Sequence, residues 1–329
     1  MAAIAESADA PQKTPRIGIL DTARGVALLA MASYHCTWDF EFFGYLDSGT
    51  AETGWLKLYA RAIAGTFLFL AGFSLVLANT PEIRWRSYWR RLGMIVAAAA
   101  AISIVTFIGT RDEWIFFGIL HSIAAASLIG LLFLRLPAFA TLLIAALLAV
   151  GVVIDNVVAP LSLHSTFFDA PWLWWVGLSE NIQRSNDYVP LFPWLTPFLF
   201  GLGIAQLATS LGWLKHLAKF GPGRNLIARA GRHSLIFYLV HQPVLFGLVY
   251  LLSLVAPAPP QDQTVGYIRQ CTASCTKSGS EAMCRSFCQC TLDKLQAQNL
   301  FKPLESGAIR ADSDERVSRI AIQCTDEAQ

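Results

Sequence analysis

Long runs of apolar residues alternate with short polar segments along most of this chain. A transmembrane helix needs about 20 residues to cross roughly 30 Å of hydrocarbon, because each residue advances it by about 1.5 Å. Seven runs approach or exceed that length, at residues 19–43, 58–79, 92–109, 117–135, 137–155, 190–211 and 234–256. The pattern predicts an all-α protein, a polytopic transmembrane helix bundle of about seven spans, whose fourth and fifth runs also fit a hairpin.

Composition separates this apolar part from a polar tail. Of the 329 residues, 15% are charged, whereas soluble domains have about 25%. Charges are sparse over residues 92–256, whereas residues 257–329 read as a soluble sequence. We therefore expect an N-terminal tail at 1–15, a transmembrane domain at 16–256 and a cysteine-rich tail at 257–329. The basic residues lie between apolar runs and form no single patch, so we expect no nucleic acid partner.

Lysine and arginine are unequally shared between alternate connections. With a cytoplasmic N-terminus, thirteen lie on the cytoplasmic side and four outside. The thirteen are Lys13, Arg16, Arg24, Arg84, Arg86, Arg90, Arg91, Arg135, Lys215, Lys219, Arg224, Arg229 and Arg232; the four are Lys57, Arg61, Arg111 and Arg184. Because basic residues favour the cytoplasmic side, we predict a multi-pass protein of a bacterial inner membrane with a periplasmic C-terminal tail. A cleaved signal peptide is the alternative for the first run, but Asp21 and Arg24 interrupt it.

Six of the seven cysteines lie in the tail, at Cys271, Cys275, Cys284, Cys288, Cys290 and Cys324. An even number of cysteines in a short polar segment is typical of disulfides in an oxidising compartment. A zinc site is the alternative, but the tail contains no histidine, and we expect no metal. Two Cys-x3-Cys pairs place their sulfurs on single helix faces, which predicts a small helical tail stapled by disulfides. Six cysteines allow 15 connectivities, which the sequence does not resolve.

Polar residues within the first apolar run are candidates for chemistry, because such groups are costly in a membrane. Arg24 and His35 are eleven residues apart, about three helical turns, so they share one face roughly 16 Å apart along the axis. Asp39 lies one turn beyond His35 and can orient its imidazole. The structural alternative is an arginine that snorkels at the helix end and an interfacial histidine.

A cluster of basic and aromatic residues precedes the third run. Arg86, Arg90 and Arg91 alternate there with Trp85, Tyr88 and Trp89, next to Arg84. Guanidinium groups bind phosphates in bidentate geometry, so this segment is a candidate loop for the phosphates of a cofactor. A positively charged anchor with an aromatic belt explains the same composition.

Two further histidines fall in apolar runs. His121 opens the fourth run and is more typical of a structural residue, whereas His241 lies near the middle of the last run. Pro243, two residues later, frees a backbone carbonyl and creates a local polar position. The connection at 156–189, with Trp172, Trp174 and Trp175, is long enough to cap a cavity.

Motifs spread over residues 16–250 together resemble one family. They are Leu20-Asp21-x-x-Arg24-Gly25, Tyr34-His35-x-x-Trp38-Asp39, Gly118-Ile119-Leu120-His121, Asp187-Tyr188-x-Pro190-Leu191-x-Pro193-Trp194, Gly231-Arg232-His233-Ser234 and Tyr238-Leu239-x-His241-Gln242-Pro243. In this order they resemble the heparan-α-glucosaminide N-acetyltransferase catalytic-domain family, which is distantly related to the acyltransferase 3 family of membrane acyltransferases.

The resemblance implies acyl transfer across a membrane. Acetyl-coenzyme A would be the cytoplasmic co-substrate, and the acyl group, expected to be acetyl, would reach a carbohydrate or another small acceptor outside. His35 would be the base or the acyl carrier, with Asp39 and His241 as further catalytic residues. Arg24, Arg86, Arg90 and Arg91 would bind the cofactor. The short chain and the cysteine tail depart from the animal enzymes, and both departures leave the acceptor open. A homo-oligomer is a further open alternative.

Two other functions compete with acyl transfer. A small-molecule transporter or exporter would show inverted repeats or paired broken helices, and neither is apparent in the sequence. A membrane scaffold that presents the tail to a partner would tolerate substitution of His35 and Asp39. The sequence contains no P-loop and no HExxH motif, so it gives no support to nucleotide hydrolysis or zinc proteolysis.

Overall fold

The described part of the chain is helical. A computed structural model describes residues 17–219, 225–259, 262–276, 279–311 and 313–328, and within these ranges it contains no β-strand. The N-terminal tail expected at residues 1–15 lies outside the described residues. Five of the helices in these described ranges are long and apolar enough to cross a membrane. The prediction of an all-helical multi-pass membrane protein is confirmed.

All seven predicted runs are helical. The helices are α1 (Gly18–Phe42), α2 (Gly54–Ala78), α3 (Trp85–Gly109), α4 (Ile119–Phe133), α5 (Ala138–Val153), α6 (Leu191–Ser210) and α9 (Ser234–Val255). A π-helical segment, Ile154–Val158, continues α5. The five that meet the length and hydropathy requirements are α2, α3, α5 with its extension, α6 and α9. Helix α1 carries several charged residues and α4 has only 15 residues, which separates both from that group.

Helix α3 begins at Trp85, seven residues before the predicted run at 92. The arginine cluster was expected in a loop, and this expectation is wrong: Arg86, Arg90 and Arg91 lie on the first two turns of α3. Hydropathy locates the part of a helix that crosses hydrocarbon. The backbone continues as a helix into the interfacial region, where arginine and tryptophan are favoured.

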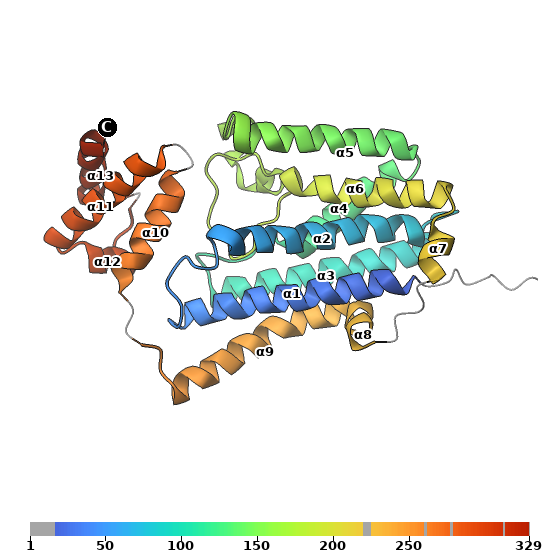
Figure 1. The fold of residues 1–329 in the computed structure, drawn as a ribbon, viewed down its shortest axis with the longest axis horizontal. Helices are drawn as coiled ribbons and strands as arrows, with labels where there is room; N and C mark the ends of the chain where they lie inside the picture. Colours follow the sequence, from blue (N-terminus) through green and yellow to red (C-terminus); the bar gives the residue numbers. More distant parts are fainter. Residues whose placement is uncertain (1–16, 220–224, 260–261, 277–278, 312, 329) are drawn as a thin grey trace, which may run out of the picture. The chain divides into compact units, whose positions relative to one another are not determined.

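The chain divides into two compact units. The first comprises Met1–Leu29, Gly65–Leu148 and Gln183–Tyr238. In it α4 packs against both α3 and α6 (Figure 1), and Leu68, Phe198, Leu199 and Leu202 have no exposed surface. Two short helices, α7 (Leu214–Lys219) and α8 (Leu226–Arg232), precede α9. They lie in a segment that the apolar pattern marked only as a connection.

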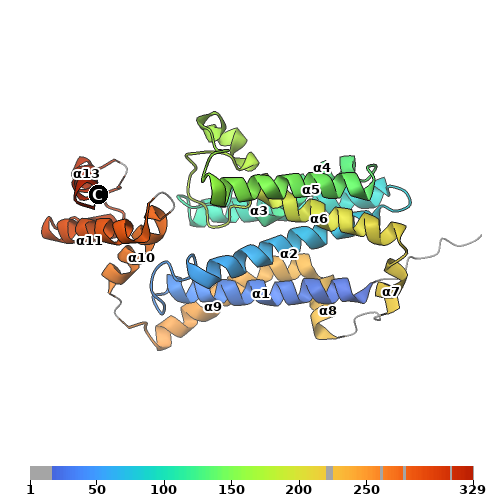
Figure 2. The same ribbon diagram turned by 45° about the horizontal axis from the view of Figure 1, so that its top comes forward.

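The second unit comprises Ala30–Ala64, Ala149–Ile182 and Leu239–Gln329. It contains the carboxyl-terminal halves of α1 and α9, whose rings meet at Phe42 and Phe246. It also contains the C-terminal helices α10 (Gln263–Cys275), α11 (Glu281–Ala297), α12 (Phe301–Glu305) and α13 (Glu315–Ala328). Helix α11 packs against both α10 and α13 (Figure 2).

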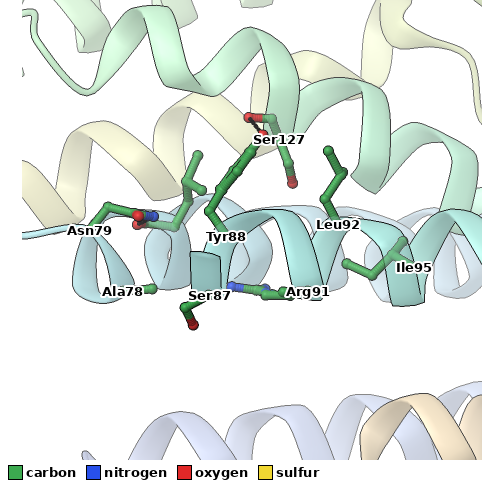
Figure 3. Close-up of a pocket in the computed structure, with 9 residues that line it drawn as sticks. Ala78, Asn79, Ser87, Tyr88, Arg91, Leu92, Ile95 and Ser127 are labelled. Atoms are coloured by element: carbon green, nitrogen blue, oxygen red, sulfur yellow. Dashed lines mark hydrogen bonds between the residues drawn. The ribbon is translucent and has the colours of Figure 1, made fainter. Parts of the chain in front are cut away.

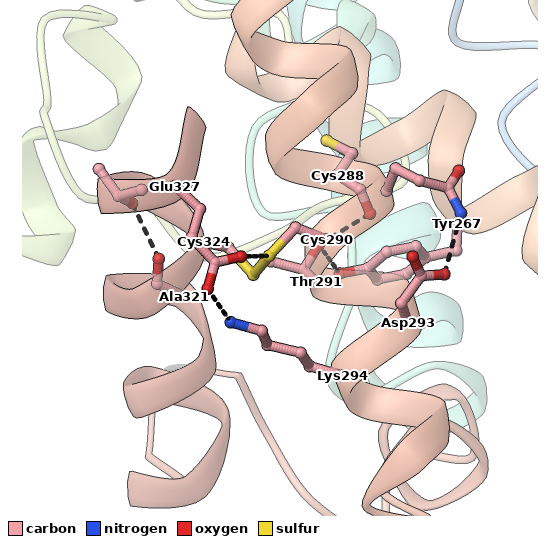
Figure 4. The surroundings of a disulfide bond; sticks show 11 residues. Tyr267, Cys288, Cys290, Thr291, Asp293, Lys294, Ala321, Cys324 and Glu327 are labelled. Atoms are coloured by element: carbon pink, nitrogen blue, oxygen red, sulfur yellow. Dashed lines mark hydrogen bonds and ion pairs between the residues drawn. A yellow bond between two sulfur atoms is a disulfide. The ribbon is translucent and has the colours of Figure 1, made fainter. Parts of the chain in front are cut away.

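Three disulfides hold the C-terminal helices together. Cys271 pairs with Cys288 and Cys275 with Cys284, so α10 and α11 form a hairpin stapled by two disulfides. The third bond, between Cys290 and Cys324, attaches α13 to α11 (Figure 4). The prediction of a disulfide-stapled helical tail is confirmed. The exact domain boundary at residue 257 stays a prediction.

These C-terminal helices have a small apolar core of their own. It is built from Leu292, Leu295, Leu300, Phe301, Val317, Ile320 and Cys324. Ser280 caps the start of α11 by accepting a hydrogen bond from the Met283 amide, which is a common way to satisfy a free amide in the first turn. A core of this size gives limited stability to a domain of about 70 residues, so covalent cross-links are expected there.

A long connection follows α5, and Asp169 organises it. Its carboxylate accepts hydrogen bonds from Ser179 Oγ at 2.7 Å, the Glu180 amide at 2.8 Å, and the amide and side chain of Asn181 at 3.0 and 2.9 Å. These donors stabilise the charged form and lower the pKa of Asp169 to about 2. The backbone carbonyl of Asp169 also accepts from the Trp174 indole at 2.9 Å. The connection is therefore an ordered loop.

Candidate functional site

The first polar cluster lies at the amino end of α1, in the first unit. Arg24 forms an ion pair with Asp21, one turn earlier, at 2.9 Å, and its guanidinium donates to Ser74 Oγ on α2. Gly231 of α8 packs directly on the Asp21 carbonyl, where any Cβ atom would clash. Arg24 is therefore fixed in direction by a carboxylate and a hydroxyl.

Arg91 of α3 lies beside the same cluster, within electrostatic range of Arg24. It lines a cleft together with Asn79, Ser87, Tyr88 and Ser127. Tyr88 points across this cleft and donates to the Ser127 carbonyl at 3.1 Å, while Arg91 extends along α3 toward Ser87 (Figure 3). Arg91 is thus a second cation within electrostatic range of Arg24, whose own charge Asp21 partly offsets, and this excess of positive charge favours an anion.

The other two arginines of the predicted group lie elsewhere on α3. Arg86 and Arg90 are exposed, and neither lines the cleft. They are four residues apart and share one helix face, whereas Arg91 follows Arg90 by one residue and is rotated by about 100°. The structure thus brings Arg24 and Arg91 together and leaves Arg86 and Arg90 at the surface.

The second polar cluster lies in the second unit, where α1 meets α9. The imidazole rings of His35 and His241 are in edge-to-face contact, with centroids 5.1 Å apart. Tyr34 contacts the His35 ring as well, at 5.8 Å. Two imidazoles in contact among apolar helices form a pair that can accept, hold and pass a proton.

Asp39 lies beside this pair and is completely buried. Its Oδ1 atom accepts a hydrogen bond of 2.7 Å from Gln242 Nε2 on α9. Its Oδ2 atom has no hydrogen-bond partner among the described residues, and within them no hydrogen bond joins Asp39 to His35. The structure therefore directs Asp39 toward Gln242, and its role toward His35 stays a prediction.

His121, at the start of α4, has a complete set of local contacts. The Gly118 amide donates to His121 Nδ1 at 3.2 Å, so Nδ1 carries no proton and the proton belongs on Nε2. That nitrogen lies 3.2 Å from Ser103 Oγ, which in turn donates to the Ile115 carbonyl at 2.6 Å. These contacts support the structural interpretation of His121.

Asp187 caps the amino end of α4, although it lies 68 residues beyond Ile119 in the chain. Its carboxylate accepts from the Ile119 amide at 2.9 Å, which satisfies a free amide of the first turn. Burial raises the pKa of Asp187, the hydrogen bond from Ile119 opposes this in part, and the resulting pKa is about 6. Tyr238 of α9 interacts electrostatically with this carboxylate, so Asp187 connects two of the motifs noted in the sequence.

One grouping of potential metal ligands occurs in the described residues, formed by Cys290, Cys324 and Glu327. The two sulfurs are bonded to each other, whereas a metal would need thiolates. Glu327 is also paired with Lys294 at 2.6 Å (Figure 4). In its oxidised form this group does not fit a metal ion.

Sequence reasoning did not assign Gln242 and Ser74 to the candidate site. Gln242 was noted only as part of a motif, although a polar amide next to His241 in an apolar run is itself a signal. Ser74 carries no such signal, because a serine in a membrane helix usually satisfies its hydroxyl on its own backbone. Ser74 does donate to the Leu70 carbonyl, and it still accepts from Arg24.

Charged and imidazole groups are buried within the apolar helices. The protein therefore belongs to the class of membrane proteins with polar centres inside their helices. Residues 16–243 match the family described as heparan-alpha-glucosaminide N-acetyltransferase, catalytic. The match covers more than half of the chain, and the protein belongs to this family. The predicted family is confirmed, and the protein is a membrane acetyltransferase. Comparison with curated proteins gave no match, and comparison with solved structures gave none.

Proposed function

We propose that the protein transfers an acetyl group from acetyl-coenzyme A to an amine or hydroxyl of an acceptor on the opposite side of the membrane. Membership of the acetyltransferase family supports the reaction. The observation that carries the assignment of residues is the contact of His35 with His241 beside the buried Asp39. No other described cluster joins two imidazoles and a carboxylate within the apolar helices.

The chemistry needs a group that takes up a proton. The acceptor nitrogen or oxygen attacks the thioester carbonyl, a new bond to the acetyl carbon forms, and the carbon–sulfur bond breaks. His35 accepts the acceptor's proton and returns one to the departing thiolate, a role worth about 10²–10⁴ in rate. Alternatively, the His35 imidazole attacks the thioester first and carries the acetyl group until the acceptor takes it up. His241 is the second imidazole available to receive the proton.

Replacement of His35 tests this assignment. His35→Ala should lower acetyl transfer to glucosamine by at least about 100-fold, because the proton acceptor is lost, while binding of coenzyme A stays the same. His216→Ala is the matched control, since His216 is exposed on α7. Full activity of the His35→Ala protein would contradict the proposal. Retention of labelled acetyl on His35 without acceptor would favour the acyl-carrier route.

We place the phosphates of coenzyme A at Arg24 and Arg91. Their proximity and the cleft beside Arg91 support this placement. Arg91→Ala should weaken coenzyme A binding by about tenfold, the loss expected for one charge-assisted contact. Arg86→Ala is the matched control and should change the affinity much less, because Arg86 is exposed and outside the cleft. Equal effects of the two substitutions on the affinity would contradict this placement. The arginine cluster would then act only as a positively charged anchor that sets the topology.

The orientation of the chain is part of the proposal. The thirteen-to-four distribution of basic residues supports a cytoplasmic N-terminus and a C-terminal region outside, in the periplasm if the host is a bacterium. A membrane-impermeant thiol reagent, added to intact cells after reduction, should label the six cysteines of the C-terminal region. Labelling only after lysis would reverse the orientation.

A further inference from the structure

The C-terminal helices contact the loop between α1 and α2 through one face of α10. The Arg269 guanidinium donates to Thr50 Oγ1 at 2.7 Å and to Asp47 Oδ2 at 3.0 Å. Gln270 donates to Ser48 Oγ at 2.9 Å. Three residues of the loop are therefore bound by two neighbouring residues of α10.

The contact is also close at the level of the backbone. A Cβ atom at Gly266 would lie 2.9 Å from the Cβ of Ser48, closer than side-chain carbons approach each other. Gly266, Arg269 and Gln270 are spaced i, i+3 and i+4, so they share one helix face. The α10 face therefore fits this loop in shape as well as in hydrogen bonding.

The same loop is attached to the carboxyl end of α1. Glu41 accepts hydrogen bonds from the amides of Gly49 at 2.5 Å and Ala51 at 2.7 Å. Tyr34 donates to the Ala51 carbonyl at 3.3 Å. Tyr34 directly precedes His35, and Glu41 follows Asp39 by two residues, so the loop is bound on both sides of the candidate catalytic residues.

The α10 helix that binds the loop is cross-linked to α11 by disulfides. Cys271 directly follows Gln270 and is bonded to Cys288 of α11, and α11 contributes Leu292 and Leu295 to the core of the C-terminal region. The face that binds the loop is thus part of a cross-linked unit. A flexible tether would need neither the paired donors of Arg269 nor the close packing at Gly266.

We infer that the C-terminal region is a brace for the carboxyl end of α1, with Arg269 as a positioning residue for His35 and Asp39. By holding the loop at residues 47–51, it fixes Glu41 and Tyr34 and through them the helix turn that carries the two groups. The region lies beyond the family match, which ends at residue 243. The effect on transfer rests on the proposed function, whereas the positional effect does not.

The test uses full-length protein with Arg269→Ala, Asp47→Ala, both together, and the exchanged pair Arg269→Asp with Asp47→Arg. Arg285→Ala is the matched control, because Arg285 forms an exposed ion pair with Glu281 on α11. Three quantities are measured: hydrogen exchange of the Gly49 and Ala51 amides, the rate at which diethyl pyrocarbonate modifies His35, and the kinetics of acetyl transfer to glucosamine.

We expect Arg269→Ala to increase amide exchange at Gly49 and Ala51 and to change the modification rate of His35 by about fivefold, the scale of one surface ion pair. The catalytic efficiency for glucosamine should fall by a similar factor, with the KM for acetyl-coenzyme A unchanged. Asp47→Ala should act alike, the double variant should be no worse, and the exchanged pair should recover part of the loss.

Unchanged exchange at Gly49 and Ala51 in Arg269→Ala would overturn the brace. Faster exchange with unaltered His35 modification would overturn it too, because the loop would then have no influence on α1. A wild-type protein that transfers no acetyl group would count against the proposed function alone, since exchange and His35 modification still decide the brace.

Discussion

The membrane helices expose large apolar side chains on their outer surfaces, whereas the C-terminal helices gather theirs into one small core. On α3, Val105 and Ile108 are 67% and 79% exposed, while Ile320 of α13 is 2% exposed. Lipid tails are as apolar as these side chains, so a membrane helix loses nothing by leaving them outside. Water makes the same exposure costly, by about 25 cal/mol for each Å².

The two regions also treat their polar groups differently. The membrane helices bury Asp39 and His241, and polar groups are costly to place within a membrane and therefore indicate function. The C-terminal region keeps its charged pairs, such as Arg285 with Glu281, at the surface, where such pairs contribute little. The membrane helices are stabilised by the surrounding lipid and by helix packing. The C-terminal region is stabilised by a small core and three disulfides.

Loss of one disulfide is the largest expected effect. Replacement of Cys290 and Cys324 together by serine opens a link between residues separated by 34 positions and should cost the C-terminal region about 4 kcal/mol. Trypsin should then digest residues 263–328 while the membrane helices stay protected. Cys36→Ser is the matched control, because Cys36 forms no disulfide. Equal protection of the C-terminal region in both proteins would show that its core suffices.

Truncation of an apolar side chain should affect the two regions unequally. Ile320→Ala removes buried volume and should destabilise the C-terminal region by about 3 kcal/mol. Ile108→Ala makes the same chemical change at a lipid-facing position and should cost less than about 0.5 kcal/mol. Heating the protein in lipid nanodiscs, with region-specific proteolysis as the readout, measures both. Similar losses would contradict the assignment of Ile108 to the lipid surface.

The smallest expected effect concerns pH and the loop after α5. The pKa of Asp169 is lowered to about 2 by its hydrogen bonds, so the loop gains stability from the ionised carboxylate above the unfolded pKa of about 4. This contribution should be lost as the pH falls from about 4 to 2. Pepsin cleavage within residues 159–182 should rise over that range. In the Asp169→Asn protein, pepsin should cleave this loop readily at every pH in the range. An equal pH response in both proteins would exclude Asp169 as the cause.

Local patterns in the sequence predicted most of the fold. Apolar length located all seven helices, because a helix in a membrane must be long and apolar wherever its neighbours lie. The start of α3 was missed, since the helix continues through arginine and tryptophan residues that hydropathy counts as polar or interfacial. The helices α7 and α8 were missed because they are too short for a periodic pattern to show.

The candidate site was predicted only in part. Arg24, His35, Asp39 and His241 were recognisable because each is polar within an apolar run. Their partners were not, because Gln242 approaches Asp39 across 203 residues and Ser74 approaches Arg24 across 50. The separation of Arg91 from Arg86 and Arg90 depends on which side of α3 faces the cleft, and spacing alone does not define that side.

The sequence by itself determined the family, the helical membrane fold and the stapled tail, because these follow from residue type and local spacing. Only the tertiary structure decided which cysteines pair, which side chain holds Asp39, and that α10 rests on the loop between α1 and α2. Each of these is a contact between residues far apart in the chain. Such contacts depend on how helices pack, and packing is set by the shapes of all the surfaces involved.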